Sequence, residues 1–225
     1  INHLAIIMDG NSRWAKKNNL NQRKGYEEGL NKINEIINIF IEKKIKNLTL
    51  YALSTDNNKR SSVGLIYHIM KSNLKTILKK ISNNSEVKVK IIGEKKNLPK
   101  NIKKILFDLE KKTKLNKVLD LNIAFNYGSD AELIHIIKNI NKFSKMQKRI
   151  QINKDLIKKY SYLLNTPDPD ILIRTGGYQR LSNFLLLQLS YTELFFTKTL
   201  WPDFSKKEIF NIFKQYQKIK RNYGL

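Results

Sequence analysis

The sequence contains no cysteine, no apolar stretch long enough to cross a bilayer and no Gly/Ser-rich linker. Without cysteine the chain forms no disulfides and carries no thiol chemistry. A membrane-spanning helix needs about 20 apolar residues and no secretory signal is present, so we expect a cytoplasmic protein. The chain starts at Ile1 instead of Met, and we expect that a short segment precedes it. A length of 225 residues suits one domain with a sizeable core, so we expect residues 1–225 to form a single domain.

Acidic residues are scarce, with 19 Asp and Glu against 43 Lys and Arg, which gives a formal net charge of +24. Such an excess is often a sign of nucleic-acid binding. The lysines are nevertheless spread over every helical segment without forming an arginine-rich stripe, so we expect no nucleic-acid partner. Positive potential would instead attract anionic diphosphates and acidic lipid headgroups, which makes peripheral contact with a membrane a second expectation.

The segment Met8–Trp14, MDGNSRW, is the most informative part of the chain. It follows the apolar run Leu4–Ile7 and precedes a segment with helical spacing, so a buried strand ends in a carboxylate, a Gly-Asn turn and an arginine. In α/β proteins such strand ends hold ligands, and the next helix offers unpaired N–H groups to an anion. Asp9 would repel a bare phosphate, so it is better suited to bind Mg²⁺ together with a diphosphate. The alternative is an ordinary turn in which Asp9 only caps the helix.

A second apolar run, Ile171–Ile173, is followed by Arg174 and a Thr-Gly-Gly turn. Arg174 and Arg180 bracket this turn, which suits two guanidinium groups that converge on one phosphate. An apolar helix is predicted from about Phe184, with Ser182 as its cap and as a hydroxyl donor to the same anion. The alternative is a turn with solvated arginines, which does not explain why arginine, glycine and hydroxyl groups gather between two buried runs.

Apolar runs alternate with stretches of helical periodicity along the chain. The predicted strands are Leu4–Met8, Leu48–Leu53, Val87–Ile92, Leu119–Phe125, Ile171–Ile173 and Leu194–Thr197. The predicted helices are Gly25–Lys43, Val63–Ser82, Leu98–Leu115, Asp130–Lys145, Asp155–Leu163 and Lys206–Arg221. This alternation favours an α/β fold with a mostly parallel sheet flanked by helices.

Four segments in this order resemble the cis-prenyltransferases, in particular the bacterial undecaprenyl diphosphate synthases. They are MDGNSRW, LYALSTDNNKR at Leu50–Arg60, LNIAFNYG at Leu121–Gly128, and a stretch that contains IRTGG, SNFLL, ELFFT and LWPDF. The resemblance covers nearly the whole chain. It implies a central six-stranded sheet and an apolar substrate tunnel. It also implies an Mg²⁺-dependent transferase that joins isopentenyl diphosphate repeatedly to an allylic diphosphate such as farnesyl diphosphate, and so makes a long-chain polyprenyl diphosphate, the precursor of a lipid carrier.

The resemblance also implies roles for individual residues. Asp9 would be the catalytic carboxylate and a Mg²⁺ ligand, Glu193 the second metal ligand, and Ser54 and Asn57 would assist proton removal. The allylic diphosphate would be bound by Gly10, Asn11, Ser12, Arg13 and Arg60. The isopentenyl diphosphate would be bound by Arg174, Arg180 and Ser182. The remaining expected substrate-binding residues are Trp14, Arg23 and Tyr26.

Several positions depart from the pattern of this family. A histidine usual after the first loop is Tyr26, which cannot become cationic, and the arginine before it stands one place late as Arg23. A tryptophan is replaced by Asn58, which removes an aromatic face. A usual Glu-His pair is Tyr178-Gln179, and a Gly-Arg pair is Ser129-Asp130. We expect these changes to affect rate and substrate choice more than reaction class.

Two other functions compete with an active enzyme. The first is a catalytically silent accessory subunit, which need not keep the six charged groups Asp9, Arg13, Arg60, Arg174, Arg180 and Glu193. The second is a basic module that binds RNA or acidic membranes. Trans-prenyltransferases are disfavoured because the chain lacks their paired aspartate-rich motifs.

The segment Ser182–Phe196 is more apolar than one helix face and one strand require. Such a pattern suits a buried core helix or an interface. The family dimerises around this segment and the following Leu200–Pro202 turn, so the resemblance implies a C2 homodimer. Such a dimer would hold Glu193 and the Arg221–Gly224 tail near the neighbouring active site.

Overall fold

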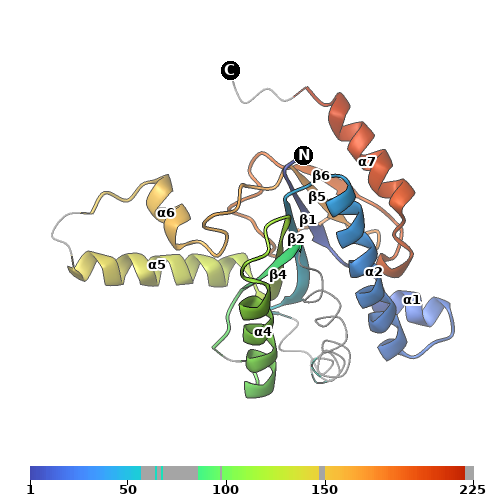
Figure 1. The fold of residues 1–225 in the computed structure, drawn as a ribbon, viewed down its shortest axis with the longest axis horizontal. Coiled ribbons are helices and arrows are strands. Elements are labelled where there is room, and N and C mark those ends of the chain that lie inside the picture. Colours follow the sequence, from blue (N-terminus) through green and yellow to red (C-terminus); the bar gives the residue numbers. More distant parts are fainter. Residues whose placement is uncertain (57–63, 65–66, 68–85, 97, 147–149, 221–225) are drawn as a thin grey trace.

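The computed structural model describes residues 1–56, 64, 67, 86–96, 98–146 and 150–220. Six parallel strands form its centre, in the order β3-β4-β2-β1-β5-β6 (Figure 1). The strands are β1 (His3–Ile7), β2 (Asn47–Ser54), β3 (Val87–Ile92), β4 (Leu119–Tyr127), β5 (Ile171–Arg174) and β6 (Glu193–Phe196). The helices are α1 (Asn11–Lys17), α2 (Gln22–Glu42), α4 (Lys100–Thr113), α5 (Ser129–Met146), α6 (Lys154–Tyr160), the 3₁₀ helix η2 (Trp201–Asp203) and α7 (Lys206–Lys218).

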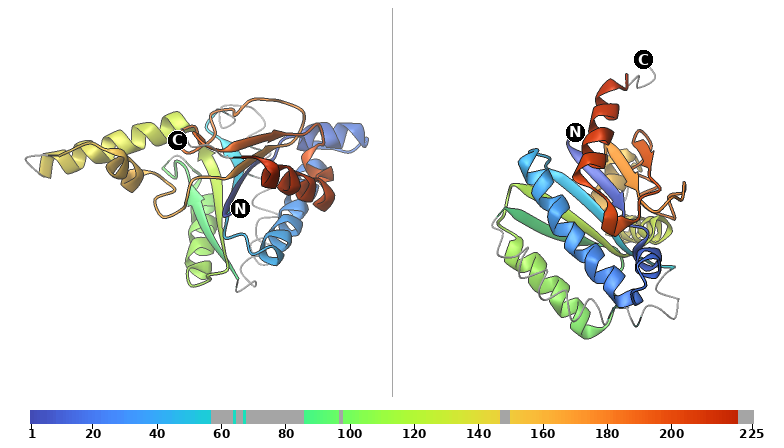
Figure 2. Two further views of the ribbon diagram at one scale, coloured as in Figure 1. Left: turned by 90° about the horizontal axis from the view of Figure 1, so that it is seen from above. Right: turned by 90° about the vertical axis from the view of Figure 1, so that its right-hand side faces the viewer.

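Both faces of the sheet are covered, which explains why its central strands are almost continuously apolar. On one face, α2, α4 and α7 bury residues such as Ile36, Leu106 and Ile209 in a common core with the strands. On the other face, the strand side chains pack against the segments that flank β5, including Leu163 and Phe184. Helices α5 and α6 extend away from this body as an arm (Figures 1 and 2). None of the described helices is long and apolar enough to cross a membrane.

The strand order contains a switch point between β1 and β5. The chain builds β2, β4 and β3 on one side of β1, and then crosses over to add β5 and β6 on the other side. Ligands of doubly wound sheets bind outside the carboxyl ends of the strands at such a point. Ile7 pairs with Arg174 in the register of these two strands, so the loops that follow them leave the sheet side by side.

The base of α5 holds the loop that follows β5. Asn183 accepts a hydrogen bond from the Ser129 backbone N–H through its side-chain Oδ1 at 3.1 Å, and another through its own carbonyl oxygen at 2.9 Å. The carboxylate of Glu132 is buried and accepts hydrogen bonds from the Tyr127 hydroxyl and from Gln188 Nε2. A buried carboxylate that accepts several hydrogen bonds holds its donors in one arrangement. Glu132 and Ser129 together therefore fix the positions of Asn183 and Gln188, and with them the loop that contains Ser182.

The predicted α/β class, the six strands and most helices are confirmed, with boundaries that shift by a few residues. The helix predicted from about Phe184 is wrong. Residues 182–188 form turns, because Ser182, Asn183 and Leu185 have φ angles of 49°, 62° and 50°, and such left-handed conformations interrupt a right-handed helix. The helix predicted over 63–82 lies outside the described residues, apart from positions 64 and 67.

Candidate active site

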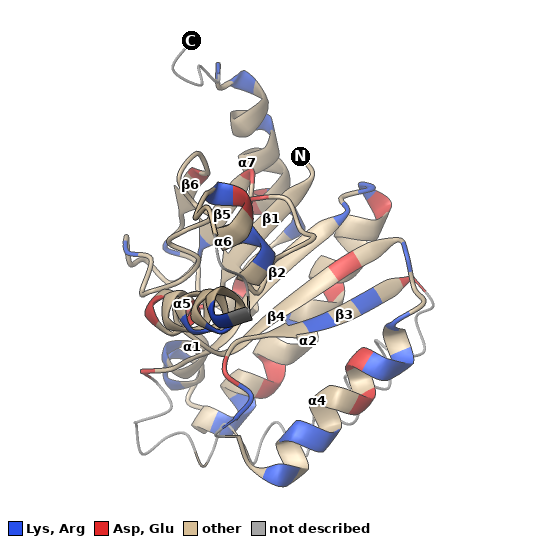
Figure 3. Ribbon diagram, turned by 90° about the vertical axis from the view of Figure 1, so that its left-hand side faces the viewer, with Lys and Arg blue, Asp and Glu red and all other residues tan. Residues whose placement is uncertain are grey.

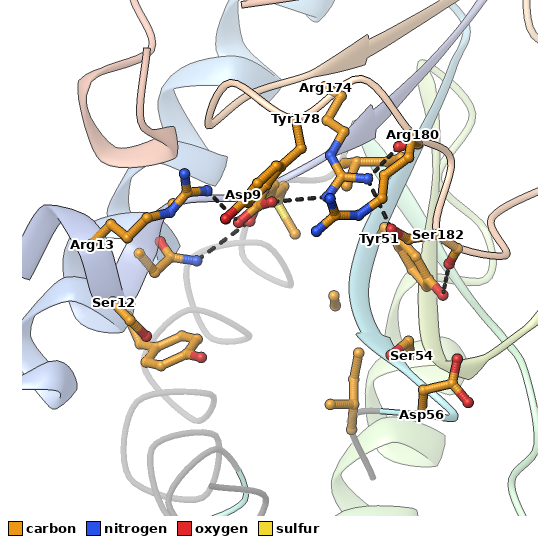
Figure 4. Close-up of a pocket in the computed structure, with 17 residues that line it drawn as sticks. Asp9, Ser12, Arg13, Tyr51, Ser54, Asp56, Arg174, Tyr178, Arg180 and Ser182 are labelled. Atoms are coloured by element: carbon orange, nitrogen blue, oxygen red, sulfur yellow. Dashed lines mark hydrogen bonds and ion pairs between the residues drawn. The ribbon is translucent and has the colours of Figure 1, made fainter. Parts of the chain in front are cut away.

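A pocket of about 540 Å³ opens at the switch point, beyond the carboxyl ends of β1, β2 and β5 (Figure 4). Its charged wall residues are three arginines and two carboxylates. The wall consists of Ile7, Met8, Asp9, Gly10, Asn11, Ser12, Arg13, Tyr26, Tyr51, Ala52, Leu53, Ser54, Asp56, Arg174, Tyr178, Arg180 and Ser182. The site therefore combines three cationic groups with the carboxylates of Asp9, after β1, and Asp56, after β2.

Asp9 contacts two of the three arginines, Arg13 and Arg174. Its Oδ1 accepts a hydrogen bond from Arg13 Nη2 and its Oδ2 one from Arg174 Nη2, each at 2.9 Å. The residue at the N-cap of α1 is Gly10, with φ at 122°, and no side chain caps the helix. The alternative in which Asp9 serves only as a helix cap is therefore excluded.

Thr175 and Gly176 join the loop after β5 to the loop after β1. The Thr175 hydroxyl accepts from the Asp9 backbone N–H at 3.0 Å and donates to the Asp9 carbonyl at 2.8 Å. The Gly176 carbonyl accepts from Arg13 Nη1 at 2.6 Å. Gly176 has φ at +85°, and a Cβ built there would lie 2.6 Å from Arg13 Nη2. This position needs glycine for its backbone and for the space that Arg13 occupies.

Arg174 is the buried member of the arginine group, with 4% of its side chain exposed. Besides Asp9, it donates to the Ser182 hydroxyl at 2.8 Å and to the Arg180 carbonyl. The prediction that Ser182 caps a helix is wrong, since no helix starts there, but its hydroxyl does lie against the expected arginine. The Tyr51 hydroxyl donates to the Ser182 carbonyl at 3.1 Å, and burial raises the pKa of Tyr51, so this tyrosine stays a neutral donor.

The structure brings ten of the predicted residues to the pocket: Asp9, Gly10, Asn11, Ser12, Arg13, Tyr26, Ser54, Arg174, Arg180 and Ser182. Trp14 and Arg23 are absent from this wall. The Trp14 indole N–H donates to Asp203 at 2.7 Å, and Arg23 pairs with Glu27 at 2.9 Å. Asn57 and Arg60 lie outside the described residues.

The two predicted metal ligands lie far apart within one chain. Glu193 pairs with Ile171 at the start of β5, whereas Asp9 follows Ile7, which pairs with Arg174 at the end of β5. Among the described residues, no three His, Cys, Asp or Glu side chains form a group that could hold a metal ion. Within one chain, Asp9 and Glu193 therefore lie at opposite ends of the sheet edge formed by β5 and β6 and do not form a shared carboxylate pair.

Three polar wall residues, Tyr51, Asp56 and Tyr178, were not predicted from the sequence, and neither were the apolar wall residues Ile7, Met8, Ala52 and Leu53. The register of β2 against β4 shifts between Tyr51 and Leu53 and again before Ser54, so simple alternation does not say which of these side chains faces the pocket. Tyr178 stood out in the sequence only as a departure. Its ring centre lies 4.0 Å from the guanidinium carbon of Arg180 and 4.7 Å from that of Arg13.

Comparison with known proteins shows the family to which this chain belongs. A family model described as putative undecaprenyl diphosphate synthase matches residues 7–224. The isoprenyl transferase of Oceanobacillus iheyensis is 41% identical over 226 residues, which span 99% of this chain and 89% of that protein. The lavandulyl diphosphate synthase of Lavandula x intermedia, solved in complex with dimethylallyl diphosphate, is 30% identical, with a TM-score of 0.93 over 100% of this chain and 98% of that one. A probable undecaprenyl diphosphate synthase from Campylobacter jejuni, also 30% identical, superposes with a TM-score of 0.84 over 100% and 99% of the two chains. This chain therefore belongs to the undecaprenyl diphosphate synthase family of cis-prenyltransferases.

Proposed function

We propose that this protein is an Mg²⁺-dependent cis-prenyltransferase that condenses isopentenyl diphosphate repeatedly onto an allylic diphosphate such as farnesyl diphosphate. Its product would be a long-chain polyprenyl diphosphate that serves as a lipid-carrier precursor. The observation that carries this proposal is the carboxylate of Asp9 between Arg13 and Arg174 at the switch point. Asp9 Oδ1 contacts Arg13 in the first turn of α1, and Oδ2 contacts Arg174 at the end of β5, so two anionic substrates can approach this carboxylate from different elements.

The allylic diphosphate would bind on the α1 side. The first-turn N–H groups of α1 have no acceptor within the helix, and Arg13 has 42% of its side chain exposed. Together they offer hydrogen bonds and positive charge to a leaving diphosphate. Gly10, Asn11 and Ser12 supply the backbone of this cradle, and Arg60, outside the described residues, is the further ligand that the family pattern assigns.

Mg²⁺ fits the donor set at Asp9. This ion commonly uses one or two protein carboxylates and fills its other positions with substrate phosphates and water. Asp9 has 28% of its side chain exposed toward the pocket, so it can hold the ion beside a diphosphate. The bound ion would neutralise charge on the departing diphosphate.

Isopentenyl diphosphate would bind on the β5 side, through Arg174, Arg180 and the Ser182 hydroxyl. In the reaction, the allylic C–O bond breaks, a C–C bond forms to the isopentenyl unit, and that unit loses a proton. Ser54, on the pocket wall at the end of β2, would assist this proton loss with Asn57. The growing apolar chain would occupy the predicted tunnel, which protects the allylic cation from water.

We infer that the active form is a C2 homodimer built on the segment around β6. This strand lies at the edge of the sheet, and its neighbourhood exposes apolar side chains that one chain leaves uncovered. Leu186, Leu187, Tyr191 and Leu194 are exposed by 49%, 43%, 67% and 43%. Patches of this kind mark interfaces, and a two-fold contact would bring Glu193 of one copy toward the other.

We also infer a cytoplasmic location with peripheral membrane contact. Lysines recur along α4 and β3 (Figure 3). On α4, Phe107 is exposed by 63% and has Lys103, Lys104 and Lys111 three or four residues away, on neighbouring positions of the helix. An aromatic ring among lysines suits an acidic lipid surface, into which an apolar product would pass.

Two measurements separate this proposal from its alternatives. Release of pyrophosphate by the purified chain in the presence of both diphosphates and Mg²⁺ would distinguish an enzyme from a silent accessory subunit. A rise in thermal stability on addition of farnesyl diphosphate with Mg²⁺ would distinguish either from a basic RNA- or membrane-binding module. Absence of both signals would overturn the proposed function.

A further inference from the structure

The three arginines of the pocket are held in different ways. Arg13 and Arg174 each donate to Asp9 and to a second protein oxygen. The guanidinium of Arg180 has neither a hydrogen bond nor an ion pair to any residue that the structure describes. Its close contact is the face of Tyr178, with 4.0 Å from Cζ to the ring centre. Arg180 is therefore oriented by an aromatic ring while its donors stay available.

Tyr178 contacts all three cations. The guanidinium carbons of Arg13 and Arg174 lie 4.7 Å and 5.7 Å from the centre of the ring that Arg180 also covers. Figure 4 shows Tyr178 between Arg13 on one side and Arg174 and Arg180 on the other. The electron-rich faces of an aromatic ring attract cations, so this ring offsets the repulsion that three neighbouring guanidinium groups would otherwise feel.

Tyrosine at position 178 leaves the net charge of the arginine cluster unchanged, whereas a carboxylate there would reduce it. A glutamate would hold the arginines through ion pairs and would cancel one of their charges. Tyr178 brings no carboxylate and contacts the three guanidinium groups through its ring, so the cluster keeps its positive charge for an incoming anion. At this position the present chain departs from the Glu-His pair usual in the family.

We propose that Tyr178 is a positioning residue that orients Arg180, and to a smaller extent Arg13, for the diphosphate groups of the two substrates. This inference rests on the proposed function for the identity of the anions. Tyr178 touches the arginines and not the reacting atoms, so its removal should weaken binding of the diphosphate more than it slows the chemical step. Because isopentenyl diphosphate is the substrate assigned to Arg180, its Michaelis constant should respond most.

The test compares Tyr178→Leu, which keeps apolar volume and loses the ring, with Tyr178→Phe, which keeps the ring. Binding of inorganic pyrophosphate is measured by calorimetry, and Michaelis constants are measured for each substrate. A cation–π contact of partly exposed groups corresponds to about a 3- to 10-fold change in affinity. We expect such a loss with Tyr178→Leu, a change below about twofold in kcat, and recovery with Tyr178→Phe. Gln179→Ala is the control, since Gln179 is exposed in the same loop and absent from the pocket wall.

A series of phenylalanines with increasing ring fluorination at position 178 sharpens the test. Fluorine withdraws electron density from the ring face and keeps its approximate shape, so a purely structural role would not follow the series. We expect pyrophosphate binding to weaken progressively with fluorination. Equal binding by Tyr178→Leu and Tyr178→Phe, or indifference to fluorination, would overturn the role of Tyr178. Tight pyrophosphate binding by a wild-type chain that shows no turnover would instead count against the proposed function alone.

Discussion

Arg174 Nη2 donates to Asp9 Oδ2 at 2.9 Å, and this contact joins the loops that follow β5 and β1. The pair is asymmetric, because the Arg174 side chain is 4% exposed and that of Asp9 is 28% exposed. A buried guanidinium depends on its carboxylate partner, so Asp9 is fixed in place while part of it still faces the pocket. Asp9 can therefore both pair with Arg174, which stabilises the fold, and act on substrates in the pocket. Measurements on its variants must report stability and activity separately.

Asp9→Ala should nearly abolish turnover in a protein that still folds. Because it removes the carboxylate partner of the buried Arg174, we also expect the free energy of unfolding to fall by about 3 kcal/mol. Loss of a carboxylate that positions a metal and the substrates should cost several kcal/mol in the transition state, on the order of a thousandfold or more in rate. The measurement is pyrophosphate release by purified protein, with circular dichroism as a check on folding. Asp155→Ala, which removes a carboxylate from the first turn of α6, is the control. Near-normal turnover by Asp9→Ala would contradict the assignment of this site.

Arg180→Lys should separate the two substrate sites. Lysine keeps the charge of arginine but loses its planar pair of donors. The Arg180 guanidinium has no hydrogen bond or ion pair to a described residue, so the substitution breaks no polar side-chain contact. We expect the Michaelis constant for isopentenyl diphosphate to rise by roughly tenfold, and that for the allylic substrate to change much less. Initial rates with one substrate varied at a time provide the values. If Arg180→Lys raised the Michaelis constants of both substrates equally, the assignment of the two substrates to distinct sites would be contradicted.

Two adjacent glycines offer a matched pair for testing Arg13. Gly176 and Gly177 have φ angles of +85° and +83°, so alanine at either one pays a similar backbone cost of about 1–2 kcal/mol. A Cβ at Gly176 would lie 2.6 Å from Arg13 Nη2 and 2.9 Å from the Asp9 carbonyl oxygen, whereas one at Gly177 has no neighbour nearer than 3.8 Å. Gly176→Ala should therefore raise the Michaelis constant for the allylic diphosphate several-fold beyond Gly177→Ala. If the two variants behave alike, the packing of Gly176 against Arg13 and Asp9 does not contribute to binding of that substrate.

Acid should destabilise the protein through His3, at the end of the sheet opposite the pocket. His3 is fully buried, with Nδ1 2.6 Å from the Pro167 carbonyl and Nε2 2.7 Å from the Thr49 hydroxyl. Burial lowers the pKa of His3 from 6.5 to about 4. Between these values the unfolded chain binds a proton that the folded chain does not, so stability is full above pH 6.5 and falls as the pH drops toward 4.

At pH 5, this linkage should lower the free energy of unfolding by about 2 kcal/mol relative to pH 7. Urea unfolding at the two pH values measures the difference. A His3→Gln variant carries no proton at this position and should lose that part of the pH dependence, whatever its absolute stability. An unchanged pH dependence in the variant would show that other groups cause the effect.

The purified chain should be a dimer at micromolar concentration. The exposed apolar residues near β6, such as Leu187 and Leu194, lose contact with water in a two-fold interface. Light scattering during size exclusion gives the mass directly. Leu194→Lys should favour the monomer and should also reduce activity, because it separates Glu193 from the neighbouring site. A stable monomer with full activity would refute this interface.

The strands could be predicted because a parallel sheet covered on both faces buries nearly every strand residue. All residues of β1 and of β5 are buried, and each strand appears in the sequence as a short apolar run. The order of the strands could not be predicted in this way, since an apolar run does not specify its neighbour. The meeting of Asp9 with Arg174 follows from that order, and only the family resemblance anticipated that these residues share a site.

The conformation of the apolar segment after Ser182 could not be predicted from its amino-acid composition. Its leucines and Phe184 are typical of a helix, but the positive φ angles of Ser182 and Asn183 turn the chain so that Phe184 packs under the sheet. That conformation depends on hydrogen bonds to residues at the start of α5. These residues lie more than 50 positions earlier in the sequence. The contact of Tyr178 with three arginines is likewise tertiary, because Arg13 comes from the opposite end of the chain.

The most direct test of the central claim is incubation of the purified chain with farnesyl diphosphate, labelled isopentenyl diphosphate and Mg²⁺. We expect label to enter an organic-soluble polyprenyl diphosphate, one pyrophosphate to be released for each unit added, and Asp9→Ala to lose both. Chromatographic sizing of the product then gives its chain length. Binding of farnesyl diphosphate without any incorporation of label, at any Mg²⁺ concentration, would contradict the proposed activity and would indicate a silent subunit instead of an enzyme.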